Sequence, residues 1–291
     1  MTADVLSGTE LAAALHARTA RRAAGSAERG HPPRLVVVLA TGEESTAWYV
    51  RSIARAAGRV GIDCTVVDVG AAATTEEIRA VLDRLAVDDA VHGIILQTPL
   101  PPGVEVADLV GSIPPGKDVD GAGPQSLGRL VCGWPGFAPA TARAVVELLD
   151  HAGHDLAGRH VVVVGRSTVV GKPLAHLLLD RDATVTVCHS RTKSLAEHTR
   201  TADVLVAAAG RIGLITADHV RPGAIVVDVG TNSTLDGRLV GDVDARTVPG
   251  VAGALTPVPG GVGPVTTALL LEHTVTAALA AAGPSATQEG P

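Results

Sequence analysis

The chain has 291 residues, of which 46% are hydrophobic and 1% aromatic, and its formal net charge is −6. This length allows two domains, and the composition predicts a core of Val, Leu, Ile and Ala. An acidic chain without a long basic run argues against nucleic acid or an anionic membrane as a partner. Three scattered cysteines without metal-ligand spacing fit a reducing cytosol, and His151 and His154 lack further ligands, so we predict no metal site.

Helical and strand patterns alternate along the first part of the chain, which implies parallel βαβ units. The expected elements are a helix over 9–29, a strand over 35–40, a helix over 44–61, a strand over 63–69, a helix over 75–86 capped by Thr75, and a strand over 91–97. No apolar run looks long enough to span a bilayer.

A passage rich in Pro and Gly, residues 99–139, shows little periodicity and is expected to join two domains. The alternation then resumes. The expected elements are a helix over 141–149, strands over 161–164, 183–188, 204–208 and 224–229, a last helix over 265–282, and a polar tail over 283–291 that we expect to be disordered.

The segment Val161–Pro173 has the pattern of a buried strand, a glycine turn and a helix. Four valines are followed by Gly165, then by Gly171, and Pro173 suits the first turn of a helix. Such a turn directs backbone N–H groups toward an anion, typically a nucleotide phosphate. The segment is not a P-loop, since five residues separate the glycines, and it does not match G-x-G-x-x-G. A turn that only packs the helix on the strand therefore remains an alternative.

The next strand ends at Cys188 and is followed by His189, Ser190 and Arg191, where NAD-binding folds usually place a carboxylate. Arg166, in the first turn, could approach the same region. Two guanidinium groups around a 2′-phosphate favour NADP over NAD. The alternative is a pair of solvated surface arginines.

Four other features are polar or rigid enough to suggest a site: Tyr49, Gln97, Asp120 and the loop 256–264. Gln97 ends a strand, and ligands of open α/β sheets bind outside the carboxyl ends of strands. Each feature also has a structural explanation. Tyr49 could cap a core, Gln97 could satisfy strand-end amides, Asp120 could fix a turn, and the prolines could form a linker.

Taken together, these stretches resemble the bifunctional methylenetetrahydrofolate dehydrogenase/methenyltetrahydrofolate cyclohydrolase family over almost the whole chain. The matching motifs are Val5–Gly8, Tyr49-Val50 with Ser52, Gln97-x-Pro-Leu-Pro101, Lys117-Asp-Val-Asp-Gly121, Gly165-Arg-Ser-x-x-Val-Gly-x-Pro173, Asp228-Val-Gly-x-Asn232, Val240-Gly-Asp-Val243, and Thr256–Pro264 with Thr266.

The resemblance implies an α/β fold of two domains with a cleft between them, the second a Rossmann-like NADP-binding domain. Residues 1–140 with the last helix 265–282 would form the folate-binding catalytic domain, and residues 141–264 the NADP-binding domain. The family oxidises 5,10-methylenetetrahydrofolate to the methenyl compound in one-carbon metabolism, with NADP⁺ as hydride acceptor, and hydrolyses the product to 10-formyltetrahydrofolate. A cytoplasmic homodimer and a tetrahydrofolate substrate are expected on the same ground.

The resemblance also implies site residues. The catalytic positions would be Tyr49, Gln97, Asp120 and position 53; the substrate-binding residues Pro259, Gly260, Gly261 and Thr266; and the cofactor-binding residues Gly165, Arg166, Ser167, Gly171, Ser190, Arg191 and Thr231.

The chain departs from the family at position 53, where the family has a lysine that serves the cyclohydrolase proton transfers. Ile53 cannot transfer a proton, and Arg51 and Arg55 are expected to point away from the face that Tyr49 shares with it. Hydride transfer needs no titrating group, so we predict a dehydrogenase with weak or absent cyclohydrolase activity. Two alternatives are a same-fold oxidoreductase acting on another folate or imine, and a non-catalytic folate- or nucleotide-binding paralogue.

Overall fold

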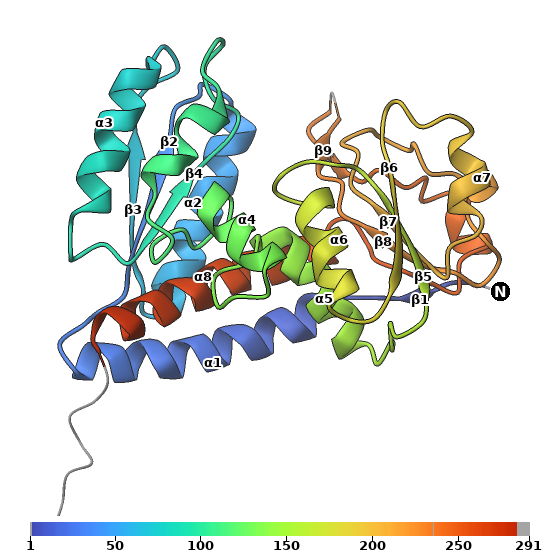
Figure 1. Ribbon diagram of the computed structural model, residues 1–291, viewed down its shortest axis with the longest axis horizontal. Coiled ribbons are helices and arrows are strands. Elements are labelled where there is room, and N and C mark those ends of the chain that lie inside the picture. The colour runs from blue at the N-terminus through green and yellow to red at the C-terminus, as the bar shows by residue number, and fades with distance from the viewer. Residues whose placement is uncertain (1, 235, 284–291) are drawn as a thin grey trace, which may run out of the picture. The chain divides into compact units, whose positions relative to one another are not determined.

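A computed structural model describes residues 2–234 and 236–283 (Figure 1). The chain forms two compact units, which we describe separately: unit 1 contains Met1–Ala13 and Ala138–Thr266, and unit 2 contains Ala14–Phe137 and Thr267–Pro291. Two long helices, α1 (Thr9–Glu28) and α8 (Val262–Ala281), start in the residues of unit 1 and end in those of unit 2. Except for Gly283, the expected disordered tail lies outside the described residues.

Unit 2 contains a three-stranded parallel sheet in the order β3-β2-β4. The strands are β2 (Arg34–Leu39), β3 (Asp63–Asp68) and β4 (Gly93–Leu96), and the helices between them are α2 (Glu44–Arg59) and α3 (Thr75–Ala86). Alternate residues of β2 face opposite sides of the sheet. Val36 and Val38 pack in one cluster with Ile78 and Leu82 of α3, so this helix covers one face.

The other face of the same sheet packs closely against α8. Gly93 of β4 has no room for a side chain, because a Cβ there would lie 2.9 Å from the hydroxyl oxygen of Thr274 and 3.1 Å from Leu35. The glycine therefore allows the helix to approach the sheet.

The start of α3 differs by one residue from the sequence prediction. The N-cap is Thr74, not Thr75, and it forms a capping box with Glu77. The Thr74 hydroxyl oxygen accepts the Glu77 N–H at 3.2 Å, and the Glu77 carboxylate accepts the Thr74 N–H at 2.9 Å. A capping box requires an acid three residues after the cap, which of the two neighbouring threonines only Thr74 has.

The passage 99–139 contains more regular structure than its sequence suggested. It includes two short 3₁₀ helices, η1 (Val106–Asp108) and η2 (Val110–Ser112), and the helix α4 (Pro124–Val131). Pro124 occupies the first turn of α4, where its missing N–H does no harm. Residues up to Phe137 belong to unit 2, so most of the passage is part of that unit rather than a linker.

Unit 1 contains a six-stranded sheet in the order β1-β11-β8-β7-β5-β6, and every described strand pair in it is parallel. These strands are β1 (Asp4–Val5), β5 (His160–Val164), β6 (Thr184–Cys188), β7 (Val204–Ala207), β8 (Ile225–Asp228) and β11 (Ala254–Leu255). A separate antiparallel pair is formed by β9 (Asn232–Ser233) and β10 (Leu239–Val240). The two parallel sheets confirm the predicted α/β fold.

The core of unit 1 lies on both faces of this sheet. Val162, Leu205 and Val226 pack in one cluster on one face. α6 packs against β5 and β6, and α5 packs against α6. The remaining helical segments of the two units are α5 (Ala140–His151), α6 (Gly171–Leu179), α7 (Leu195–Thr199), η3 (Ala217–His219) and η4 (Val248–Gly250).

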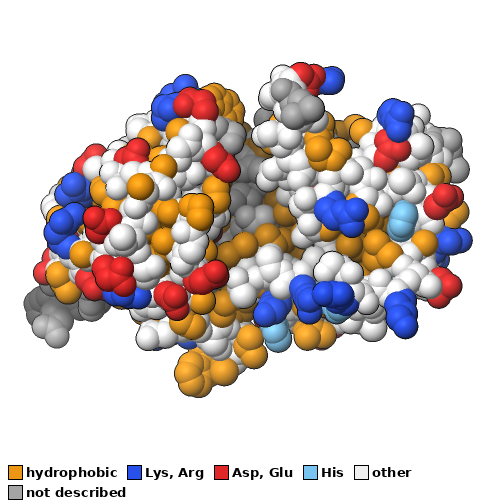
Figure 2. Space-filling model, turned by 90° about the horizontal axis from the view of Figure 1, so that it is seen from above, with side chains coloured by type: hydrophobic (Ala, Val, Ile, Leu, Met, Phe, Trp, Pro, Cys, Tyr) orange, Lys and Arg blue, Asp and Glu red, His pale blue; other side chains and the backbone are white. Residues whose placement is uncertain are grey.

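By length and composition, α8 is long and apolar enough to cross a membrane, so the prediction that no apolar run is long enough to span a bilayer is wrong. The most apolar window of α8 is 61% buried, however, which is typical of a core helix. The face shown in Figure 2 carries acidic and basic side chains interspersed with apolar ones.

Candidate functional site

Each sheet has one point where the strand order reverses, and one predicted site residue lies directly at each of these points. In unit 1 the chain runs from β5 to β6 and then returns to β7 on the other side of β5; in unit 2 it runs from β2 to β3 and returns to β4. Ligands of open α/β sheets bind at such switch points, outside the carboxyl ends of the strands. Gly165 directly follows β5 and Gln97 directly follows β4, so each lies at its unit's switch point.

The glycine turn after β5 has no room for side chains. Gly165 has a φ of 143°, and a Cβ there would collide with the carbonyl oxygen of Ala208, which follows β7. A Cβ at Gly171 would collide with the carbonyl oxygen of Gly165. Ser167 closes the turn, because its hydroxyl accepts the Val170 N–H at 3.1 Å. Bare backbone at the start of α6 is the arrangement that lets a pyrophosphate approach closely.

Around this turn the side chains of Arg166, Ser190 and Arg191 are exposed. The backbone after β6 is fixed locally, since the Arg191 N–H donates to the His189 ring at 3.1 Å. Within the described part of the chain, neither Arg166 nor Arg191 forms an ion pair with a carboxylate. Both guanidinium groups are therefore available to an anionic ligand. Thr231, the other predicted cofactor residue, is exposed in the loop after β8.

In unit 2 the structure brings Tyr49 and Asp120 together. Tyr49 lies on α2 and hydrogen-bonds with the side chain of Thr267. Burial, with a smaller contribution from the charge of Asp120, raises the pKa of Tyr49 to about 12, so the phenol stays protonated near neutral pH. Thr267 was not among the sequence-predicted residues, although it directly follows the predicted Thr266.

The two carboxylates of the loop 117–121 have different surroundings. Asp118 is buried and accepts hydrogen bonds from Gly123 N–H (2.9 Å), Ala122 N–H (3.2 Å) and the Ser126 hydroxyl (2.5 Å), so it fixes the turn into α4. No described residue donates a hydrogen bond to the Asp120 carboxylate. Burial and the nearby charge of Asp118 raise the pKa of Asp120 to about 7.

The loop that carries Asp120 lies beside β4. The Ile94 N–H of β4 donates to the Lys117 carbonyl oxygen at 2.8 Å, and the His273 ring hydrogen-bonds with the Val119 carbonyl oxygen at 2.8 Å. Gln97 is anchored at the end of β4, where its N–H donates to Val38 O at 2.9 Å. Its side-chain amide donates to the Thr98 carbonyl oxygen at 2.9 Å.

Ile53 lies on α2, one turn after Tyr49, and its side chain is fully buried. Arg51 and Arg55 are exposed, and Arg51 pairs with Glu44 at 2.5 Å, so these cations do point away from the face of Ile53, as the helical spacing predicted. The Ser52 hydroxyl donates to the Tyr49 carbonyl oxygen at 2.7 Å. The environment of position 53 therefore gains no proton-transfer group from the neighbouring residues of the helix.

The loop 256–262 is held against the start of α1 in unit 1. The Gly8 N–H donates to the Gly260 carbonyl oxygen at 2.9 Å, and a Cβ at Gly8 would collide with the carbonyl oxygen of Gly261. Pro259 follows a cis peptide bond, and Gly260 has a φ of 107°. The Thr266 hydroxyl is buried and donates to Val262 O at 3.2 Å within α8, so its one donor is used and its oxygen can only accept.

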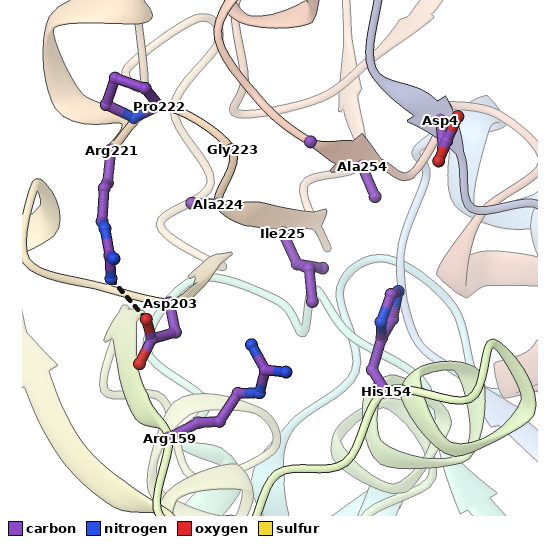
Figure 3. A pocket seen from close by; sticks show the side chains of 11 residues that line it. Asp4, His154, Arg159, Asp203, Arg221, Pro222, Gly223, Ala224, Ile225 and Ala254 are labelled. Carbon is purple, nitrogen blue, oxygen red and sulfur yellow. Dashed lines mark hydrogen bonds and ion pairs between the residues drawn. The ribbon is translucent and has the colours of Figure 1, made fainter.

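A cavity of about 360 Å³ in unit 1 lies at the opposite, amino-terminal edge of the sheet (Figure 3). Arg221 donates to Asp203 at 2.5 Å on one side of it, and Arg159 and His154 also line it. None of the predicted site residues lines this cavity. Within residues 2–234 and 236–283, no group of three or more His, Cys, Asp or Glu side chains is arranged to hold a metal ion.

Comparison with known proteins gives matches over most of the chain. A family model described as the catalytic domain of tetrahydrofolate dehydrogenase/cyclohydrolase matches residues 6–120, and one described as its NAD(P)-binding domain matches residues 139–282. "Bifunctional protein FolD 1" from Saccharopolyspora erythraea is 64% identical over 273 residues, which is 94% of this chain and 93% of the relative. The protein of the same name from Rhodococcus jostii is 63% identical over 94% of this chain and 92% of its own length.

Two solved structures are also similar. The methylenetetrahydrofolate dehydrogenase/cyclohydrolase FolD from Campylobacter jejuni has a TM-score of 0.91 and 40% identity, covering 95% of this chain and 98% of that one. The Trypanosoma brucei enzyme, solved with NADP and an inhibitor, has a TM-score of 0.92 and 36% identity, covering 98% and 100% of the two chains.

Proposed function

Since the chain belongs to the tetrahydrofolate dehydrogenase/cyclohydrolase family, we propose that it oxidises 5,10-methylenetetrahydrofolate to 5,10-methenyltetrahydrofolate with NADP⁺. The observation that carries the proposal is the glycine turn of unit 1, beside which Arg166 and Arg191 form no ion pair with any described residue. Gly165 and Gly171 leave bare backbone for a pyrophosphate, and the two guanidinium groups suit a 2′-phosphate.

In the dehydrogenase step the protein mainly binds and orients the two reactants. NADP⁺, when bound, supplies the hydride acceptor. Gly165, Ser167 and Gly171 would hold its phosphates, and Arg166, Ser190 and Arg191 its 2′-phosphate. No titrating side chain is needed at the carbon that loses the hydride, so this step does not depend on position 53.

We assign the folate to unit 2. Asp120 has free hydrogen-bonding capacity and suits the N–H groups of a pterin. Tyr49, held by Thr267, would orient the ring system, and Gln97 would act near the reacting carbon. Pro259, Gly260, Gly261 and Thr266 are proposed as further substrate residues, and they belong to unit 1. On this assignment residues 1–140 with 265–282 supply the other folate contacts, and residues 141–264 bind NADP.

The cyclohydrolase step is proposed to be weak or absent. Hydrolysis of the methenyl cation requires proton transfers, and a general acid–base group typically contributes about 10²–10⁴-fold. Ile53 is buried and has no such group, and Arg51 and Arg55 point away. The chain is therefore proposed to release the methenyl compound as its main product.

The test is an absorbance assay with methylenetetrahydrofolate and either NADP⁺ or NAD⁺. We expect the NADPH band and the ultraviolet band of the methenyl compound to rise together, with NADP⁺ preferred. Arg166→Ala and Arg191→Ala should each lower kcat/KM for NADP⁺ by about 10- to 100-fold, because a charge-assisted contact is lost, and should leave kcat/KM for NAD⁺ unchanged. Equal use of both cofactors by the wild type would contradict the assignment, and no NADPH formation would favour the alternative substrates.

A homodimer and a cytoplasmic location belong to the same proposal. β6 is at the edge of the six-stranded sheet, where a second chain could pair. Cys64, Cys132 and Cys188 are all free thiols, which fits a reducing compartment. Light scattering at several protein concentrations measures the oligomeric state directly.

A further inference from the structure

The carboxyl ends of β7 and β8 carry loops whose motifs the proposed function leaves without a role. Two buried aspartates lie among these loops, Asp228 with 4% and Asp242 with 0% of its surface exposed. We call Asp228 and Asp242, together with Gly230 and Gly241, the aspartate clasp. All of its members belong to unit 1.

The Asp242 carboxylate fills a nest of backbone N–H groups. One oxygen accepts from Ala209 N–H at 2.6 Å and Gly210 N–H at 2.9 Å. The other accepts from Arg211 N–H at 2.8 Å and from the Asn232 side-chain amide at 2.9 Å. Three successive N–H groups that converge in this way form an anion-binding concavity. The chain thus supplies its own anion to the loop after β7, and ties that loop to the one after β8.

Asp228 fixes the backbone of Asp242 in turn. Its carboxylate accepts the N–H groups of Gly230 (2.9 Å), Asp242 (2.9 Å) and Val243 (3.0 Å). Its own backbone N–H donates to the Thr256 hydroxyl at 2.7 Å. The clasp therefore joins the loops after β7 and β8 to the segment after β10 and to the start of the loop 256–262.

The two glycines make this arrangement possible. A Cβ at Gly230 would collide with the Asp242 carboxylate, and a Cβ at Gly241 would collide with the Asp228 carboxylate. Each glycine lies beside the aspartate of the opposite segment. The pairing explains why both segments combine Asp and Gly at short spacing.

We propose that Asp242 is a positioning residue for the dinucleotide: by occupying the nest of residues 209–211 and holding Asn232, it sets the loops after β7 and β8 against which the cofactor lies. This inference rests on the proposed NADP site. Thr231, a predicted cofactor residue, lies between Gly230 and Asn232. Asn232 donates a hydrogen bond to the Asp242 carboxylate, and Gly230 is packed against it. Both loops leave the carboxyl edge of the sheet, where a nucleotide binds in this architecture.

The test compares Asp242→Ala, the isosteric Asp242→Asn and a matched control, Asp203→Asn. The Asp203 carboxylate also accepts a backbone N–H, from His160 at 3.0 Å, but at the amino-terminal edge of the same sheet. We expect Asp242→Ala to weaken NADP⁺ binding by about 10- to 100-fold in calorimetry, and to raise KM for NADP⁺ with a small change in kcat and in folate KM. Asp242→Asn keeps one acceptor oxygen and should lose less, and Asp203→Asn should bind NADP⁺ like the wild type.

Chemical rescue separates positioning from general destabilisation. Asp242→Ala leaves the nest open, so formate should bind there, raise the Tm of this variant without any cofactor, and restore part of its NADP⁺ affinity. Formate should change neither the wild type nor Asp203→Asn. If Asp242→Ala does not fold, the comparison rests on Asp242→Asn, whose volume is unchanged.

Two results would overturn the inference: wild-type NADP⁺ affinity in a folded Asp242 variant, or equal losses of NADP⁺ and folate affinity without rescue by formate. A wild type that fails to bind NADP⁺ would refute the proposed function instead. In that case the formate effect on Tm still reports whether the nest takes an anion.

Discussion

Each unit holds two aspartates at a strand end or in the loops around its sheet, but their hydrogen-bond partners differ. In unit 1, Asp228 and Asp242 each accept at least three hydrogen bonds. In unit 2, Asp118 also accepts three, whereas Asp120 accepts none from the described residues. A buried carboxylate with all its partners is scaffold, while one without partners has capacity for a ligand.

The groups left without partners also differ in charge. At the nucleotide turn of unit 1 they are the guanidinium groups of Arg166 and Arg191, which match an anion. In unit 2 the group is the carboxylate of Asp120, which matches hydrogen-bond donors and cations. Free hydrogen-bonding capacity, rather than residue type, thus distinguishes the proposed binding groups from the structural ones.

The largest expected effect is on the cyclohydrolase rate, at position 53 of unit 2, where Ile53 stands in place of the family's lysine. Ile53→Lys would place an amine one helical turn from Tyr49. Burial should lower the pKa of this lysine, which suits proton transfer near neutral pH. We expect hydrolysis of the methenyl compound to accelerate by about 10²–10⁴-fold, the range of one general acid–base group. The measurement is single-turnover decay of the methenyl band in a buffer where spontaneous hydrolysis is slow.

Ile53→Met is the matched control, because it adds length without an amine and should gain nothing. Rapid clearance of the methenyl compound by the wild type would show that another group does this work. No gain in a folded Ile53→Lys variant would mean that the site has diverged further, and would favour a different substrate.

Most of the fold could be predicted from the sequence, because buried parallel strands are continuous apolar runs. The strands at 34–39 and 160–164 were expected within a residue of their observed bounds. The two-residue strands β1 and β11 are too short to show a period, and they form through pairing with a neighbour distant in sequence. The helix α4 was missed in a passage where prolines and glycines mask an eight-residue pattern.

The candidate site was only partly predictable. The motifs pointed to Tyr49 and Asp120, which the structure brings together. The resemblance selected Asp120 and not Asp118, but the physical difference between them lies in the hydrogen bonds of Asp118, which only the folded loop provides. Nor could it find the role of Asp242, whose donors lie 31 to 33 residues away in Ala209, Gly210 and Arg211.

The second prediction compares the loss of each of the two carboxylates of unit 2. Asp120→Ala should lower folate turnover by about 10²–10³-fold, because the ligand loses charge-assisted hydrogen bonds, should leave NADP⁺ affinity nearly unchanged, and should not lower the free energy of unfolding. Asp118→Ala should lower the free energy of unfolding by about 2–4 kcal/mol, because three buried donors lose their acceptor. Steady-state kinetics, NADP⁺ calorimetry and urea unfolding of both variants check this. Loss of NADP⁺ affinity in Asp120→Ala, or loss of stability equal to that of Asp118→Ala, would contradict the comparison.

The last prediction concerns the pH dependence of stability that Asp120 causes. Its pKa is raised to about 7 in the folded chain by burial and by the charge of Asp118, against about 3.9 in the unfolded chain. Between these values the folded state keeps a proton that the unfolded state has released, so stability falls as pH rises.

Asp120→Asn removes this titration, and it should therefore match the wild type near pH 4 and exceed its unfolding free energy by at most about 4 kcal/mol at pH 8. Asp203→Asn is the control, because the contribution of Asp203 to stability changes with pH in the opposite direction. A backbone N–H of His160 and the charge of Arg221 lower the pKa of Asp203, so its stabilisation is present at neutral pH and is lost as pH falls. Urea unfolding at pH 5, 6, 7 and 8 measures both differences. A difference for Asp120→Asn that is constant over this range would show that the Asp120 carboxyl has partners after all, and the distinction between the two units would fail.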